Sequence, residues 1–231
     1  MKKSNFSNSL ISFSKVILIV FSLSFLLTSC LGPKRLNKWV AKQYSDKSFS
    51  SMKNNTISIT SKVKAVDDNL SFSKSNTTDF LPLIFYWSWS YNNICTLNPK
   101  IPITNFSSTI LGNNKLKQKL NGQRIELTVE NIPNTFTLVD KGHEIFFVYA
   151  YGWDVMSIKP DIKDLVVSYK LFNADNSVAK NGSITIPDSD KGVKMGMFQS
   201  VKKKTWQYLT DYDANIVSMT NSFIDKLITE L

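Results

Sequence analysis

The feature that most constrains the fold is an apolar stripe at the C-terminal end of the chain. Apolar side chains recur there every three or four residues, with polar residues between them, which predicts one long amphipathic helix. The stripe consists of Leu209, Tyr212, Ile216, Met219, Phe223, Leu227 and Leu231. Such a helix needs its apolar face covered, either by the chain's own core or by a partner. We expect it to lie in the core.

Ahead of this helix, the middle of the chain alternates apolar and polar residues, which is typical of half-buried strands. The alternation is clearest at 57–65, 124–130, 165–172 and 183–186. Turn signals at 173–176 and 181–182 connect the last two, and 135–140 is a plausible return strand. Residues 145–151 are apolar throughout, which predicts a central strand covered on both faces. The region 124–187 is therefore predicted to be an antiparallel meander.

Two shorter helices are also predicted, one before the strand at 57–65 and one before the strand at 124–130. One has apolar residues at helical spacing, namely Leu36, Trp39, Val40 and Tyr44. The other covers 115–120. Runs of strands with helices at the ends favour an α+β fold, with an antiparallel sheet packed against terminal helices and a long C-terminal helix. Because no internal repeat is visible, we expect 56–231 to form a single domain.

The N-terminal end has the pattern of an export signal. Lys2, Lys3 and Lys15 precede an apolar run at 16–27, and small residues follow it. The run has 12 residues, whereas a membrane-spanning helix needs about 20. We therefore predict a signal peptide at 1–29.

The tetrapeptide Leu27-Thr28-Ser29-Cys30 resembles the lipobox of bacterial lipoproteins, an aliphatic residue and two small residues before a cysteine. The resemblance implies that the Cys30 thiol receives a diacylglyceryl group and that cleavage occurs before Cys30. A thiolate is nucleophilic enough for this chemistry near neutral pH. Residues 30–55 are then a lipidated tether, a short helix and a loop. The alternative is a chance cysteine beside an ordinary cleavage site, or an uncleaved hydrophobic anchor.

The residues after the cysteine bear on the sorting of such a lipoprotein. In many lipoproteins an Asp at this place marks retention in the inner membrane, but this chain has Leu31-Gly32. Acidic residues here direct some lipoproteins to the cell surface, whereas Pro33-Lys34-Arg35 is basic. The resemblance therefore implies an outer-membrane protein that is anchored by lipid and faces the periplasm.

The chain is basic, with a formal net charge of +10. The segment 1–29 carries three lysines and no acidic residue, so its removal leaves +7. In the cell envelope the expected counter-charges are anionic headgroups or lipopolysaccharide phosphates, and nucleic acid is not an expected partner. A solvated basic surface, which would include Lys202-Lys203-Lys204, is the simpler interpretation.

Side chains that could carry chemistry are few. With the lipobox cysteine acylated, Cys95 has no disulfide partner, and we expect it to be buried and inert. His143, the only histidine, lies in the turn-like sequence 140–144, and no nucleophile-elbow motif accompanies it. Residues 188–192 are similar to the start of a calcium loop, but Gln199 stands where such a loop has its Glu. We predict no catalytic, cofactor or metal site.

The most unusual stretch is an aromatic row. On a strand, Phe85, Trp87, Trp89 and Tyr91 all point to one face. The row could be a platform that stacks a sugar ring or packs an acyl chain. It could equally be the thickest layer of the core, and aromatic rows usually are core. We expect the core, and the exposure of Trp87 and Trp89 distinguishes the two.

Two functions are compatible with these features. The first is a non-enzymatic accessory lipoprotein of the cell envelope, held by its lipid and working with an envelope protein partner. In outline, 55–231 is similar to auxiliary lipoproteins of envelope transport systems, which place a lipid-anchored α+β domain against a membrane partner. The second is a glycan- or lipid-binding lipoprotein that uses the aromatic row.

Overall fold

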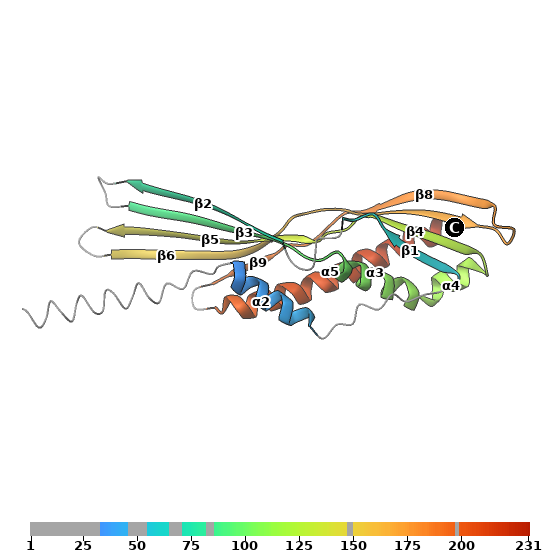
Figure 1. Cartoon of the computed structure of the whole chain (residues 1–231), viewed down its shortest axis with the longest axis horizontal. Coiled ribbons are helices and arrows are strands. Elements are labelled where there is room, and N and C mark those ends of the chain that lie inside the picture. The colour runs from blue at the N-terminus through green and yellow to red at the C-terminus, as the bar shows by residue number, and fades with distance from the viewer. Residues whose placement is uncertain (1–32, 46–54, 65–70, 82–85, 147–149, 197–198) are drawn as a thin grey trace, which may run out of the picture. The chain divides into compact units, whose positions relative to one another are not determined.

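The computed structural model describes residues 33–45, 55–64, 71–81, 86–146, 150–196 and 199–231, within a compact unit that spans 33–231 (Figure 1). In chain order its elements are α2 (Pro33–Tyr44), β1 (Ile57–Ser61), β2 (Ser71–Leu81), β3 (Tyr86–Thr96), α3 (Lys100–Gly112), α4 (Asn114–Leu120), β4 (Arg124–Asn131), β5 (Thr135–Phe146), β6 (Ala150–Pro160), β7 (Leu165–Phe172), β8 (Val178–Ile186), β9 (Val193–Met195) and α5 (Val201–Glu230). The predicted signal peptide, Cys30 and Phe85 lie outside the described residues.

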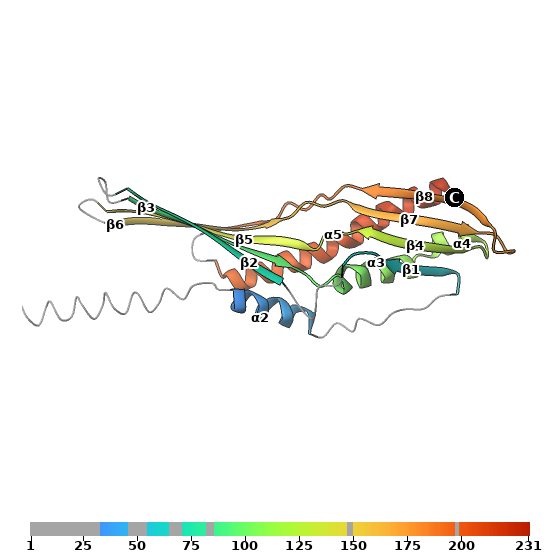
Figure 2. The ribbon, with the colours of Figure 1, turned by 45° about the horizontal axis from the view of Figure 1, so that its top comes forward.

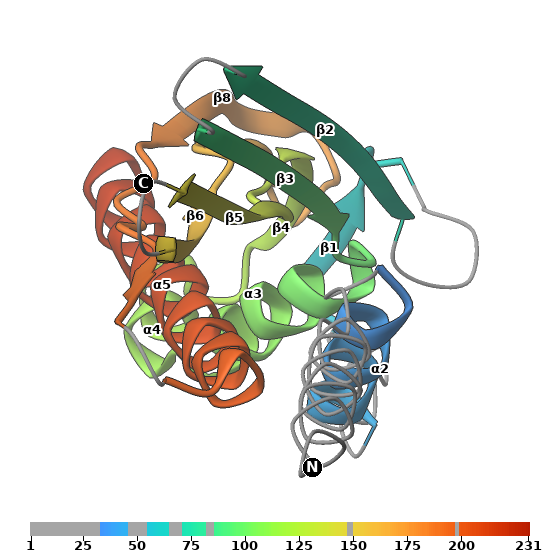
Figure 3. The same cartoon turned by 90° about the vertical axis from the view of Figure 1, so that its left-hand side faces the viewer.

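The strands form two sheets rather than the single meander predicted from the sequence. One sheet has four strands in the order β1-β4-β7-β8, and the other has five in the order β2-β3-β5-β6-β9. Neighbouring strands are antiparallel except for β1, which runs parallel to β4. The helices lie on one side of the strands (Figure 3). The predicted α+β fold, with antiparallel pairing and a long C-terminal helix, is confirmed.

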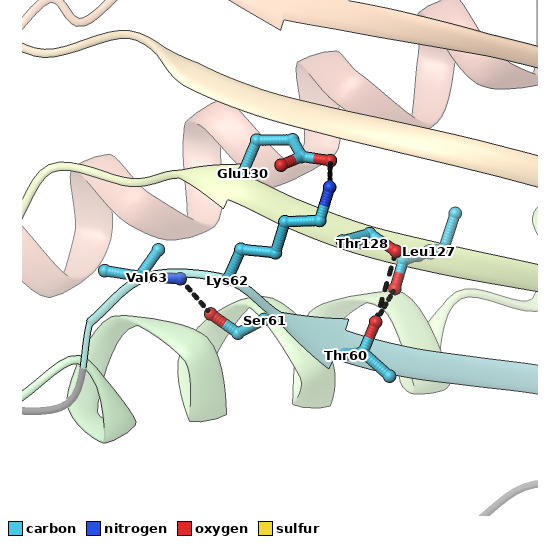
Figure 4. Close-up of polar contacts among 7 residues, drawn as sticks. All are labelled: Thr60, Ser61, Lys62, Val63, Leu127, Thr128 and Glu130. Atoms are coloured by element: carbon cyan, nitrogen blue, oxygen red, sulfur yellow. Dashed lines mark hydrogen bonds and ion pairs between the residues drawn. The ribbon is translucent and has the colours of Figure 1, made fainter.

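Polar contacts hold β1 at the edge of the four-stranded sheet (Figure 4). The hydroxyl oxygens of Thr60 and Thr128 lie 3.1 Å apart. Beyond them, Lys62 Nζ donates to Glu130 Oε1 at 2.9 Å. This hydrogen bond holds the pKa of the Glu130 carboxyl below its usual value. An exposed pair of this kind adds little stability, so its main effect is to fix the register of β1 on β4.

The long helix α5 connects the other helices to both sheets. It contacts α2, α3 and α4, and also β8 of the four-stranded sheet and β9 of the five-stranded sheet. Figures 1 and 2 show it running along both sheets. Of the predicted apolar stripe, all residues are buried except Leu231, which is half-buried. Phe223 is fully buried, with its ring centroid 5.7 Å from that of Phe106 on α3. The prediction that the stripe lies in the core is confirmed.

The short helix α2 packs along the first half of α5. Trp206 Nε1 donates to the carbonyl oxygen of Trp39 at 3.0 Å, and the Tyr44 hydroxyl donates to Asp213 Oδ1 at 3.3 Å. The same carboxylate oxygen accepts a hydrogen bond from Asn105 of α3 at 2.8 Å. Asp213 therefore joins three helices, and the predicted short helix belongs to the same compact unit as the strands.

The strands change sheet five times along the chain, and the two shortest passages are the one between β4 and β5 and the one between β6 and β7. The backbone N–H of Asp161, in the second passage, donates to the carbonyl of Thr135 at 2.9 Å. The buried hydroxyl of Tyr212 on α5 donates to the carbonyl of Pro133, in the first passage, at 2.6 Å. These bonds tie the two passages to each other and to the long helix.

The hairpin of β5 and β6 corrects two predictions. Residues 140–144, expected to be a turn, lie inside β5 and pair with both β3 and β6. Residues 145–151, expected to be one central strand, include the place where the chain reverses, because Phe146 ends β5 and pairs directly with Ala150 of β6. The Asp-Lys-Gly pattern is typical of turns, but Gly142 here has a packing role described below.

Two further local patterns differ from expectation. The sequence does not predict α3, because its β-branched residues and Pro102 are poor helix formers. Its residues Ile101, Phe106 and Ile110 are buried, and this packing outweighs propensity. Gly182, expected in a turn, lies within β8, where a side chain would press against the ring of Tyr169.

Candidate binding site

The aromatic row lies in the far half of the five-stranded sheet, defined here as Tyr86–Tyr91 of β3, Asp140–Phe146 of β5 and Ala150–Met156 of β6. These segments form one continuous antiparallel ladder. They run on beyond the start of α5 at Val201 (Figures 1 and 2). Among the residues that the structure describes, no helix covers the far half.

The aromatic row is exposed to solvent to a large extent. Trp87 is 42% exposed, and Trp89 and Tyr91 are half-buried. The two indoles meet edge to face, with ring centroids 5.9 Å apart. The expectation that the row is the thickest layer of the core is wrong, because α5 begins only beyond the row and does not cover it. Phe85, the fourth predicted member, lies outside the described residues.

Trp89 is held in place by a glycine on the neighbouring strand. Trp89 and Gly142 are directly opposite each other in the ladder of β3 and β5. A Cβ atom at position 142 would overlap the six-membered ring of Trp89. The indole therefore lies flat across the backbone of β5, a position that any side chain at 142 would block.

The opposite face of the far half carries a second set of rings. The Tyr86 hydroxyl lies 2.6 Å from His143 Nδ1, and the two rings stack at 5.9 Å between centroids. The other side of His143 stacks on Trp153 at 5.0 Å. The only histidine of the chain is thus fixed in a strand between two aromatic rings, and not exposed in a loop as its sequence context suggests.

A cavity of about 510 Å³ lies between the far half and the start of α5. It is lined by Trp89, His143, Glu144, Gly152, Trp153, Met156, Met195, Gly196, Gln199 and Val201. Strand alternation places the side chains of Trp89, Glu144 and Met156 on the same face. Trp89 is the one member of the predicted row in this lining, so sequence reasoning found the indole but missed the residues around it.

The polar groups of the cavity are few and lie at its rim. Gln199 Oε1 accepts a hydrogen bond from the backbone N–H of Gly196 at 3.1 Å, which leaves its NH₂ group able to donate. Glu144 forms no ion pair with any residue that the structure describes. The lining contains no lysine or arginine. Such a cavity suits a neutral ligand with one apolar face and several hydroxyl groups.

The other candidate groups of the sequence, Cys95 and residues 188–192, have structural roles. Cys95 is fully buried, and burial raises the pKa of its thiol, so it is unreactive. In the sequence 188–192, the Asp188 side chain accepts hydrogen bonds from the backbone N–H of Asp190 and the side chain of Asn215. That segment is a loop held by side-chain hydrogen bonds. Within the described ranges, no cluster of His, Cys, Asp and Glu side chains could hold a metal ion.

Comparison with known proteins adds no assignment. No family model, no curated protein and no solved structure matches this chain. Among the described residues, no helix is both long enough and apolar enough to cross a membrane.

Proposed function

We propose that this protein is a lipid-anchored, non-enzymatic accessory protein of the bacterial cell envelope that binds a glycan in the cavity beside Trp89. Its anchor is the lipid on Cys30, in the outer membrane and facing the periplasm. The observation that carries the binding role is a partly exposed indole at the wall of an open cavity.

The size of the cavity supports a small-molecule ligand. Binding sites for such ligands usually have volumes of roughly 300–1,000 Å³ and combine apolar walls with a few placed polar groups. The cavity has about 510 Å³, enough for a short saccharide. Two residues of the lining, Gly152 and Gly196, contribute no side chain to it.

The chemistry of the lining favours a sugar over an acyl chain. A sugar ring has an apolar face that can lie on an indole, and its hydroxyls can bond to the carboxylate of Glu144 and the amide of Gln199. An acyl chain in the same place would remove water from Glu144 without replacing its hydrogen bonds, which is unfavourable.

The first experiment measures glycan binding by tryptophan fluorescence. The probes are short neutral oligosaccharides. We expect saturable binding that Trp89→Ala weakens by about tenfold, the loss expected for one aromatic contact. Trp87→Ala is the matched control, because Trp87 lies on the same strand and face but does not line the cavity.

A second variant tests binding with a substitution that should not affect folding. Gln199→Ala changes an exposed side chain at the cavity rim and should weaken binding without lowering the melting temperature. If no probe binds, or if Trp87→Ala weakens binding as much as Trp89→Ala, the cavity is not the glycan site.

The anchor is tested separately by Cys30→Ser. This variant should lose labelling by radioactive palmitate and accumulate as unprocessed precursor. Normal labelling and processing of the serine variant would exclude the lipobox assignment.

A second candidate is docking to an envelope protein partner through Trp87. That side chain is 42% exposed yet lies outside the cavity, and exposed tryptophans are common centres of protein interfaces. Crosslinking of the intact lipoprotein in cells tests this role. A partner lost with Trp87→Ala but retained with Trp89→Ala would favour docking over glycan capture.

A further inference from the structure

The helix α2 begins very close to the proposed lipid attachment site. Pro33, its first residue, follows Cys30 by three positions. Three residues span at most about 10 Å even when fully extended. If Cys30 carries a lipid, the first turn of α2 must therefore lie near the headgroups of the membrane.

The two faces of α2 differ completely in character. Leu36, Val40 and Tyr44 are buried. The side chains on the other face are basic and exposed, namely Lys34, Arg35, Lys38 and Lys42. At 100° per residue these four lie around the direction opposite to the buried stripe. No Asp or Glu occurs in Pro33–Tyr44, so the exposed face is uniformly cationic. We call these four side chains the basic face.

The orientation of the basic face is fixed by the packing of α2 on α5. The hydrogen bonds from Trp206 to Trp39 and from Tyr44 to Asp213 hold α2 at two points along its length. Trp206 precedes Asp213 on α5, as Trp39 precedes Tyr44 on α2. Rotation of α2 about its own axis would therefore break both hydrogen bonds. The start of α5 adds further charge nearby, with Lys203 exposed and Lys202 lying 4.6 Å from the Trp206 ring.

We propose that the basic face of α2 docks on anionic phospholipid headgroups of the membrane that holds the lipid anchor. This inference rests on the proposed lipidation of Cys30. The negative potential of an anionic membrane acts within about 8 Å of its surface, and the short connection lets the basic face of α2 come within that distance when the helix lies along the surface. Basic residues beside a lipid anchor commonly act as a second attachment signal. The domain is thereby held in one orientation instead of turning freely about its lipid.

Lysine footprinting of the intact lipidated protein tests this docking. The protein is reconstituted into vesicles of phosphatidylcholine alone and of phosphatidylcholine with phosphatidylglycerol, and the acylation rate of each lysine is measured by mass spectrometry. We expect Lys38 and Lys42 to react about tenfold more slowly in the anionic vesicles, and high salt should remove the difference. Lys117 and Lys119, exposed on α4, are the internal control and should react equally in both.

A double variant sharpens the result. Lys38→Gln combined with Lys42→Gln should abolish the protection of Lys34, whereas Lys117→Gln with Lys119→Gln, which removes the same charge elsewhere, should leave it intact. The docking proposal is wrong if Lys38 and Lys42 react at equal rates in the two kinds of vesicle. It is also wrong if the α4 lysines are protected in the anionic vesicles as strongly as Lys38 and Lys42. Failure of the protein to float with either vesicle would instead contradict the lipid anchor, so the two proposals fail in different ways.

Discussion

The two sheets are built from similar antiparallel ladders, but they differ in what covers them. In the four-stranded sheet, Ile125, Leu127 and Val129 of β4 are fully buried, and their neighbours on the same strand are polar and half-buried. In the far half of the five-stranded sheet, Trp87 is 42% exposed and Trp89 lies beside a cavity. The same kind of strand therefore forms core in one region and an accessible surface in the other.

The cause of this difference is the extent of α5 rather than the strands themselves. Where the five-stranded sheet passes along α5, Phe136 is buried with its ring 5.0 Å from that of Tyr208. Beyond Val201 no helix of the described part of the chain continues this packing, and the aromatic side chains contact each other and a glycine instead. The candidate ligand site forms where the five-stranded sheet extends beyond the start of α5.

The largest effect is expected in the covered region. Phe223→Ala removes a fully buried ring that packs on Phe106, and such changes cost about 3–5 kcal/mol. Urea unfolding followed by circular dichroism measures this loss. An unchanged free energy of unfolding would mean that α5 does not form the cover described here.

A smaller loss is expected from Gly142→Ala in the far half. The new methyl group must displace the Trp89 ring, and overpacking of this kind costs about 1–3 kcal/mol. In a Trp89→Ala background the same substitution should be nearly neutral. A double-mutant cycle measures the coupling, and additive losses would contradict the close approach of the ring to β5.

Alkaline pH should weaken the covered region in particular. Burial, followed by the hydrogen bond to Glu230, raises the pKa of Tyr169 from 10.0 to about 12, and burial also raises the pKa of Tyr208 and Tyr212. The unfolded chain loses these protons first, so the contribution of these tyrosines to stability should be constant below about pH 10 and fall as the pH rises toward 12. Melting temperatures measured across this pH range show whether stability falls in the expected direction. Tyr169→Phe should make stability less dependent on pH, because the phenylalanine ring packs like that of tyrosine but has no ionisable hydroxyl.

The smallest effect is expected from Trp87→Ala. Exposed side chains usually change stability by no more than about 0.5 kcal/mol, and Trp87 keeps 42% of its surface in water. The melting temperature should therefore stay close to that of the unchanged protein. A loss as large as that of Phe223→Ala would show that the far half is covered after all.

Much of the fold follows from local sequence patterns. The strands at 124–131 and 165–172 and the stripe of α5 are readable because one face of each is buried and the other is solvated. The helix α3 is not readable, since its form depends on packing against α5 rather than on its own residues. The division into two sheets also escapes prediction, because strand patterns do not reveal which strands pair.

The candidate site was only partly predictable. The alternation of Trp87 and Trp89 identified the row, but not its exposure, which depends on where α5 begins. Gly142 was the missed signal, because a glycine inside a strand often marks a close approach of another group, but its neighbours gave the sequence the appearance of a turn. The contributions of Met195 and Gln199 come from segments distant along the chain, and no local pattern indicates them.

The packing of α2 on α5 has a consequence for the order of folding. The two hydrogen bonds that dock α2 join residues 167 and 169 positions apart. A chain made from its N-terminus contains α2 long before the helix on which it packs. A helix of 12 residues is marginal by itself, so α2 should remain unstructured until α5 has been completed. Deletion of α5 should therefore release α2, and docking of α2 should be among the slowest steps of folding.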